Sequence, residues 1–79
     1  MILSPEQCRA GRAWLGLKQD ELARLAGVSL STVRDFEAGR RQPIRNNLHA
    51  LSDALHRKGI TPAFDEEGNP SGLNFRLTQ

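Results

Sequence analysis

Polar and mixed-charge side chains gather between residues 29 and 36, in a stretch of chain that could read the edges of DNA bases. Val33 and Phe36 stand three residues apart, which predicts that they form the buried face of a short helix. The outer face of this helix keeps small, polar and charged side chains: Leu30, Ser31, Thr32, Arg34 and Asp35. A short helix with such a face fits the major groove of DNA, where each base pair presents its own pattern of donors and acceptors.

The residues just before this stretch predict a second short helix that packs against the first at a sharp angle. Small and apolar residues fall on one face of residues 19–26: Leu22, Ala23 and Ala26. Gly27 suits the left-handed position that ends a helix, and Ser29 can cap the next helix by accepting a free backbone N–H. Residues 19–36 are therefore expected to form a helix, a tight turn and a second helix.

This arrangement resembles the helix-turn-helix of the Cro/repressor-like (XRE) family of bacterial and phage regulators. The resemblance covers roughly residues 8–58 and includes three segments: Arg12-Ala-Trp-Leu-Gly-Leu, Gln19-Asp-Glu-Leu-Ala and Phe36-Glu-Ala-Gly-Arg-Arg-Gln-Pro. It implies a mainly α fold with a lambda-repressor-like four-helix DNA-binding domain. The residues after about 59 lie outside the resemblance, and their own pattern adds a C-terminal β-hairpin or strand. The resemblance also implies binding to double-stranded DNA.

The family reads bases from the start and middle of the second helix of the motif. By position, the resemblance implies that Leu30, Ser31 and Asp35 read bases, with Thr32 and Arg34 beside them. Leu30 could touch a thymine methyl, Asp35 could accept from cytosine N4, and Arg34 could bind guanine or a phosphate. No Gln or Asn stands at these positions, which puts adenine recognition by this helix in doubt. A solvated or internally paired carboxylate is the alternative for Asp35.

The resemblance also implies a set of phosphate contacts. Gln19 occupies the place from which the family anchors a phosphate, beside the free N–H groups of a helix N-terminus. A plain surface residue is the alternative for Gln19. Further phosphate contacts are expected from a serine and three arginines: Ser29, Arg40, Arg41 and Arg45. For the arginines, the alternative is a solvated basic loop.

Arg12 and Glu37 match positions that form a largely buried ion pair in similar proteins. The resemblance therefore assigns Arg12 to structure and not to DNA. If the pair is buried, removing one partner leaves an unpaired charge, which costs about 3–5 kcal/mol.

Four helices are expected, over residues 5–15, 19–26, 30–38 and 45–58, so that residues 1–59 make the DNA-binding domain. Ser4 caps the first helix, Pro5 takes its first position and Gln7 completes a capping box. The last helix has a stripe of three leucines on one face: Leu48, Leu51 and Leu55.

The residue pattern changes after the last helix, and residues 60–79 predict a β-hairpin that serves as a dimerisation tail. Residues 60–65 are extended and contain Pro62, residues 66–72 are rich in turn formers, and residues 73–77 alternate apolar and polar side chains. Because two strands alone are marginal in water, the hairpin must pack on the helices, pair with a second subunit, or both. The apolar residues of the last strand are expected in a dimer interface: Leu73, Phe75 and Leu77.

The chain has 79 residues and a formal net charge of +2, which is consistent with one small domain. Residues 1–45 hold eight Lys or Arg against five Asp or Glu, whereas residues 46–79 hold three against four. This bias fits contact with phosphates, although an ordinary soluble surface is the alternative.

Four further side chains are candidates for special roles. Cys8 falls on the inner face of the first helix and is expected to be a small buried hydrophobe, with a redox sensor as the alternative. Trp14 lies beside the core face of that helix and is expected to be partly buried. His49 and His56 are seven residues apart, which predicts exposed or interface positions, because a metal site needs a closer pair and further ligands.

The sequence contains no recognisable set of catalytic residues, cofactor motif or metal-ligand cluster, so neither an enzyme nor a cofactor is expected. It also has no apolar run near the ~20 residues of a membrane span and no signal-peptide pattern, which indicates the cytoplasm. The function expected is sequence-specific binding of a homodimer to a palindromic operator, with repression as the outcome, because the chain leaves little surface for an activating or sensing domain. One alternative is an antitoxin-type regulator that also binds a protein partner through its tail. The other is a helix-turn-helix fold that binds only protein.

Overall fold

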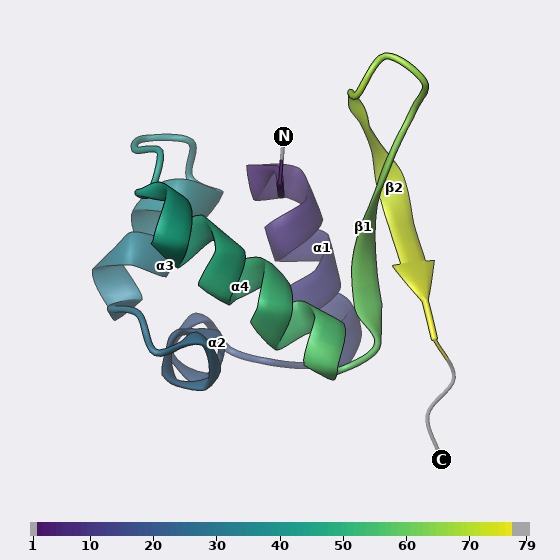
Figure 1. Cartoon of the computed structure of the whole chain (residues 1–79). Coiled ribbons are helices and arrows are strands. Elements are labelled where there is room, and N and C mark those ends of the chain that lie inside the picture. The colour runs from purple at the N-terminus through teal and green to yellow at the C-terminus, as the bar shows by residue number, and fades with distance from the viewer. Residues whose placement is uncertain (1, 77–79) are drawn as a thin grey trace.

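The computed structural model describes residues 2–76 as a cluster of four helices with a two-stranded hairpin on one side (Figure 1). The elements follow the chain in the order α1 (Pro5–Leu15), α2 (Gln19–Ala26), α3 (Leu30–Glu37), α4 (Arg45–Arg57), β1 (Ile60–Phe64) and β2 (Pro70–Phe75). The mainly α fold with a C-terminal hairpin is therefore confirmed. Helices α3 and α4 each end one residue before the predicted position, where Ala38 and Lys58 act as C-caps.

Local side-chain bonds explain where the first helices begin and end. The Ser4 hydroxyl accepts from the backbone N–H of Gln7, and the side-chain oxygen of Gln7 accepts from the backbone N–H of Ser4. These two bonds form the predicted capping box of α1. Gly27, with φ of +71°, ends α2 in the left-handed conformation, and Ser29 caps α3 by accepting from the N–H of Thr32.

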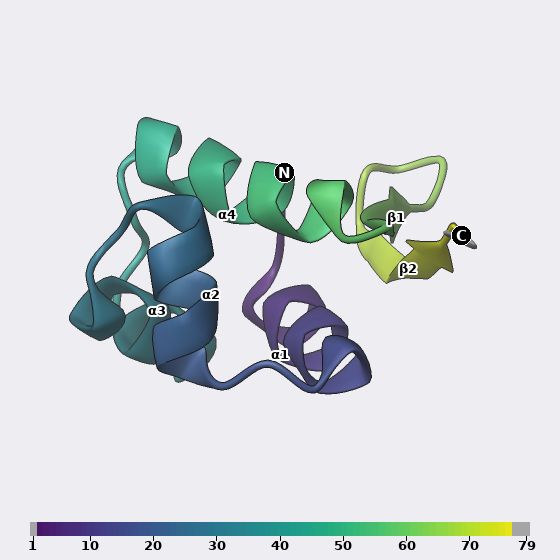
Figure 2. The same cartoon turned by 90° about the horizontal axis from the view of Figure 1, so that it is seen from below.

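The core lies where α2 and α3 meet α4, which runs across both of them in Figure 2. Val33 and Phe36 of α3 are buried, as predicted, and so are the three leucines of α4. Leu22 and Ala23 of α2 fill the space between them. This packing fixes α3 with one face sealed and the other face toward solvent.

The hairpin packs against α1 and α4 and forms an antiparallel pair in which Ile60 lies opposite Phe75 and Pro62 opposite Leu73. Gln7, which is 4% exposed, fastens the hairpin to α1. Its amide nitrogen donates to the carbonyl oxygens of Ala63 at 2.8 Å and Gly72 at 3.0 Å, one on each strand. The hairpin therefore satisfies the expectation that it packs on the helices of its own chain.

Two details differ from the prediction: the start of the second strand and the exposure of Trp14. The second strand begins at Pro70 and not at residue 73, because the turn is confined to residues 65–69, where the Asp65 carboxylate accepts from the N–H groups of Glu67 and Asn69. Trp14 is 68% exposed and not partly buried, because its ring lies outside the core and contacts only the half-exposed ring of Phe75 among the described aromatic side chains, at 4.5 Å between centroids and a tilt of 38°. Leu77, predicted in the last strand, lies outside the described residues.

Candidate DNA interface

Helix α3 presents the predicted face to solvent. Leu30, Ser31 and Arg34 are exposed, while Thr32 and Asp35 are half-buried at the edge of that face. At the start of the helix, the Ser29 hydroxyl hydrogen-bonds with the hydroxyls of Ser31 and Thr32. Three hydroxyl groups thus gather at the N-terminus of α3, where the helix dipole favours an anion.

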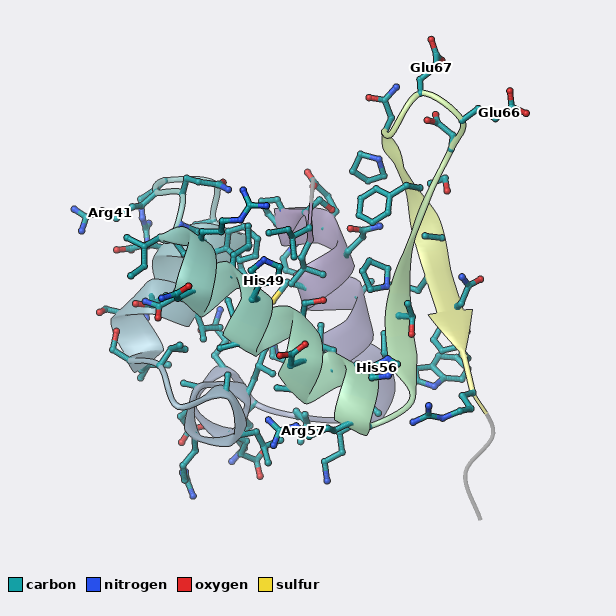
Figure 3. The ribbon with its side chains drawn as sticks, in the orientation of Figure 1. Arg41, His49, His56, Arg57, Glu66 and Glu67 are labelled. Atoms are coloured by element: carbon teal, nitrogen blue, oxygen red, sulfur yellow. The ribbon has the colours of Figure 1, made fainter. Side chains whose placement is uncertain are left out.

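The arginines after α3 divide into two kinds. Arg40 pairs with Asp35, at 3.1 Å between Nη2 and the carboxylate, so the internally paired alternative for Asp35 is the one that the structure contains. This pair joins a residue expected to read bases with a residue expected to bind phosphate. Arg41 and Arg45 are both exposed, and Figure 3 shows Arg41 extending outward from the loop.

A shallow groove lies between α3 and the loop that leads to α4, lined by Thr32, Asp35, Arg41, Gln42, Pro43, Ile44 and Asn47. Ile44 is 68% exposed and adds an apolar side chain to this groove. Sequence reasoning missed Ile44 and Asn47, although an isoleucine outside the apolar stripe of α4 was a signal that it does not belong to the core. The groove places apolar and polar groups beside the predicted base-reading residues.

Glu37, the last residue of α3, is only 2% exposed, and its carboxylate accepts hydrogen bonds from three side chains. Arg12 donates to it through Nε and Nη2, both at 2.9 Å, so the residues assigned to a structural ion pair do form one. The amide of Gln19 donates to the same carboxylate at 3.1 Å and the thiol of Cys8 at 3.3 Å. Arg9 donates to the backbone oxygen of Glu37. Sequence reasoning missed the contacts from Cys8, Arg9 and Gln19, which depend on three helices meeting.

The hydrogen bonds to Glu37 shift its own pKa and the pKa values of two partners, Arg12 and Cys8. Burial by itself would raise the pKa of Glu37, but hydrogen bonds from Arg12, Gln19 and Cys8 hold this pKa below its ordinary value. The bond to Glu37 raises the pKa of Arg12. Burial, with the Glu37 charge, raises the pKa of the Cys8 thiol, which therefore remains protonated and unreactive. Cys8 serves as a buried hydrogen-bond donor, which the sequence did not indicate.

The remaining candidates lie on other faces. His49 and His56 are exposed on α4, and Figure 3 shows them apart from each other. Within residues 2–76, no three His, Cys, Asp or Glu side chains come together as they would around a metal ion. In the same residues, no helix has the length and apolar character needed to cross a membrane. The hairpin turn carries Glu66 and Glu67, at the opposite end of Figure 3 from Arg41.

The sharp α2–α3 turn, the sealed inner face of α3 and its polar outer face are the features of a helix-turn-helix DNA-binding protein. Residues 9–60 match the HTH_3 family, described as helix-turn-helix. The chain belongs to this family of Cro/C1-type (XRE) regulators, which bind DNA, regulate transcription and are not enzymes. A protein of Methanothermobacter thermautotrophicus, named an uncharacterized HTH-type transcriptional regulator, is 40% identical over 62 residues, or 76% of this chain and 90% of the relative.

Proposed function

We propose that this chain is a homodimeric repressor that occupies a palindromic operator with α3 in the major groove. The observation that carries the proposal is the division of α3 into two faces. Val33, Phe36 and Glu37 are at most 2% exposed, whereas Leu30, Ser31 and Arg34 face solvent beside the arginine-bearing loop. Occupancy of an operator requires only such a DNA-binding face and a second copy of the chain. A cytoplasmic location is part of the proposal.

Base recognition is assigned to the outer face of α3. Leu30 contacts a thymine methyl, and Arg34 binds guanine or a neighbouring phosphate. The hydroxyls of Ser31 and Thr32 bind base edges. Asp35 accepts from cytosine N4 with the carboxylate oxygen that Arg40 leaves free, because both bonds from Arg40 go to the other oxygen, Oδ1.

Phosphate contacts fix the position of α3 in the groove. Gln19 binds a phosphate at the N-terminus of α2, and Ser29 binds one at the N-terminus of α3. Arg41 and Arg45 follow the DNA backbone on the other side of α3, as does Arg40 with the part of its guanidinium not bonded to Asp35. Each contact adds affinity without distinguishing between sequences.

Dimerisation is assigned to residues 60–79, with residues 1–59 as the DNA-binding domain. Phe75 is 50% exposed and Trp14 is 68% exposed, so these two contacting rings leave an apolar surface beside the free edge of β2. A second copy that covers this surface would remove an exposed strand edge from both subunits. Leu73, Phe75 and Leu77 are the proposed interface residues. The two copies of α3 would then lie about 34 Å apart, one turn of DNA.

An antitoxin-type regulator is the second candidate, because the exposed Trp14 and Phe75 rings also suit a protein partner. A dimer that forms in the isolated protein and covers these rings would favour the repressor. Rings that stay exposed in the isolated protein, with a tail that orders only on binding another protein, would favour the antitoxin.

The test is a fluorescence titration of the protein with random duplex DNA and with duplexes selected from a random pool, at two salt concentrations. A specific regulator should enrich a palindrome and lose affinity steeply as salt rises. Arg41→Ala/Arg45→Ala should flatten the salt slope by about 0.9 for each phosphate that the variant no longer neutralises. The matched control is Arg24→Ala/Lys58→Ala, which removes two exposed charges from another face of the protein. Equal, weak binding to every duplex would refute the proposal.

A further inference from the structure

We infer that Glu37, although buried, is a positioning residue for DNA binding, because it holds the Gln19 amide in the orientation that a phosphate contact requires. The inference rests on the proposed function, in which Gln19 binds the DNA backbone. It extends that function to a residue that touches no DNA, and it gives the buried ion pair a role beyond stability.

The geometry of Gln19 supports this role. Gln19 is the first residue of α2 and is half-exposed. Its amide nitrogen has two hydrogens, and one of them is used in the 3.1 Å bond to Oε1 of Glu37. The other hydrogen remains for a ligand. A glutamine side chain that is already fixed loses less conformational entropy on binding than one that rotates freely.

A carboxylate so close to a phosphate site would repel the phosphate unless its charge were balanced. Arg12 supplies that balance by donating a hydrogen bond to each carboxylate oxygen of Glu37, both at 2.9 Å. Cys8 donates to Oε2, which further restricts rotation of the carboxylate. The Glu37 carboxylate is thus fixed in position, and its negative charge is balanced by Arg12. It can therefore orient Gln19 without repelling the DNA phosphates.

The same bond links the two DNA-contacting helices. Glu37 ends α3, while Gln19 begins α2, so the Gln19–Glu37 bond joins the phosphate-binding end of one helix to the far end of the base-reading helix. A phosphate held by Gln19 therefore has a fixed position relative to the outer face of α3.

The test is a double-mutant cycle on affinity for a duplex selected from a random pool. Gln19→Ala should weaken binding about tenfold in the parent protein but no more than twofold in the Glu37→Met background, which has a side chain of similar length with no oxygen to accept from Gln19. Gln42→Ala is the matched control, because its exposed amide lies in the loop after α3. Its effect should be the same in both backgrounds.

The outcomes separate this inference from the proposed function. If the parent binds the duplex and Gln19→Ala costs the same factor in both backgrounds, the positioning role is refuted and the proposed function stands. If the parent binds no duplex, the proposed function fails and the positioning role fails with it.

A measurement on the unaltered protein covers the case in which Glu37→Met does not fold. In a ¹⁵N-edited NMR spectrum, one side-chain amide proton of Gln19 should be protected from exchange and keep its shift when DNA is added, while the other should move. The Gln42 amide protons provide the comparison for a freely exposed side chain. Gln19 protons that exchange as fast as those of Gln42 would overturn the inference.

Discussion

Replacing Gln7 tests whether the hairpin is held to the helices by one buried amide. Gln7→Met keeps the length and unbranched shape of the side chain but removes its three hydrogen bonds: one from the Ser4 N–H and two to the carbonyl oxygens of Ala63 and Gly72. At about 0.5–1.5 kcal/mol for each bond, the free energy of unfolding should fall by about 2–4 kcal/mol. This is a large fraction of the stability of so small a domain.

Urea denaturation followed by circular dichroism measures this decrease. Ser4→Ala is the matched control, because it removes only the bond from the Gln7 N–H to the Ser4 hydroxyl and should cost about 1 kcal/mol. Gln7→Glu retains an acceptor for the Ser4 N–H but points a carboxylate at two carbonyl oxygens. It should therefore be destabilised at neutral pH and recover partly on acidification. A Gln7→Met variant no less stable than Ser4→Ala would refute the reasoning.

Three further predictions concern charge and association. Since the folded-state pKa of Glu37 is depressed, its stabilising effect should be lost as pH falls from the unfolded value of about 4.3 toward the folded one. Arg12→Met should lower the free energy of unfolding by about 3–5 kcal/mol at pH 7, and this loss should shrink at low pH, where Glu37 can be protonated. Urea titrations across pH measure both effects. Asp35→Asn removes the negative charge that pairs with Arg40 and should raise affinity for random duplex DNA about threefold to tenfold in a fluorescence titration. Phe75→Ala should weaken the proposed dimer about tenfold in sedimentation equilibrium.

Each of these predictions has a control that removes a comparable group elsewhere. Arg24→Met breaks an exposed pair with Asp20 and should change stability by less than about 0.5 kcal/mol. Asp53→Asn, on the exposed side of α4, should not raise random-duplex affinity as much as Asp35→Asn. Ser71→Ala, exposed on β2, should leave the dimer intact. A control with the same effect as its partner variant would contradict the corresponding prediction.

The sequence predicted the parts of the fold that depend on near neighbours. The capping box of Ser4 and Gln7, the glycine that ends α2 and the serine that caps α3 act within three or four residues, so their side chains alone indicate the boundaries. The apolar spacing of Val33 and Phe36 likewise determined which face of α3 is buried.

Among features that depend on distant segments, the Arg12–Glu37 ion pair was predicted only through the family resemblance, and the other contacts were not predicted. The bonds from Gln7 to the hairpin cross 56 and 65 residues of sequence, and the Trp14–Phe75 contact joins opposite ends of the chain. The Asp35–Arg40 pair is close in sequence, but which of the two roles Asp35 takes depends on how the chain turns after α3. In the candidate DNA interface, sequence and resemblance named the residues, while their internal partners became visible only in three dimensions.

The separation of charge along the molecule has a kinetic consequence. The arginine-bearing loop lies on one side of Figure 3 and the acidic hairpin turn on the other, so these opposite charges are separated across a protein whose net charge is only +2. On the proposed function, the field of a DNA duplex attracts the side that carries Arg41 and repels the turn that carries Glu66 and Glu67, which turns the protein during approach. Productive encounters then outnumber those expected from random orientation, and this advantage in the association rate fades as salt screens the field.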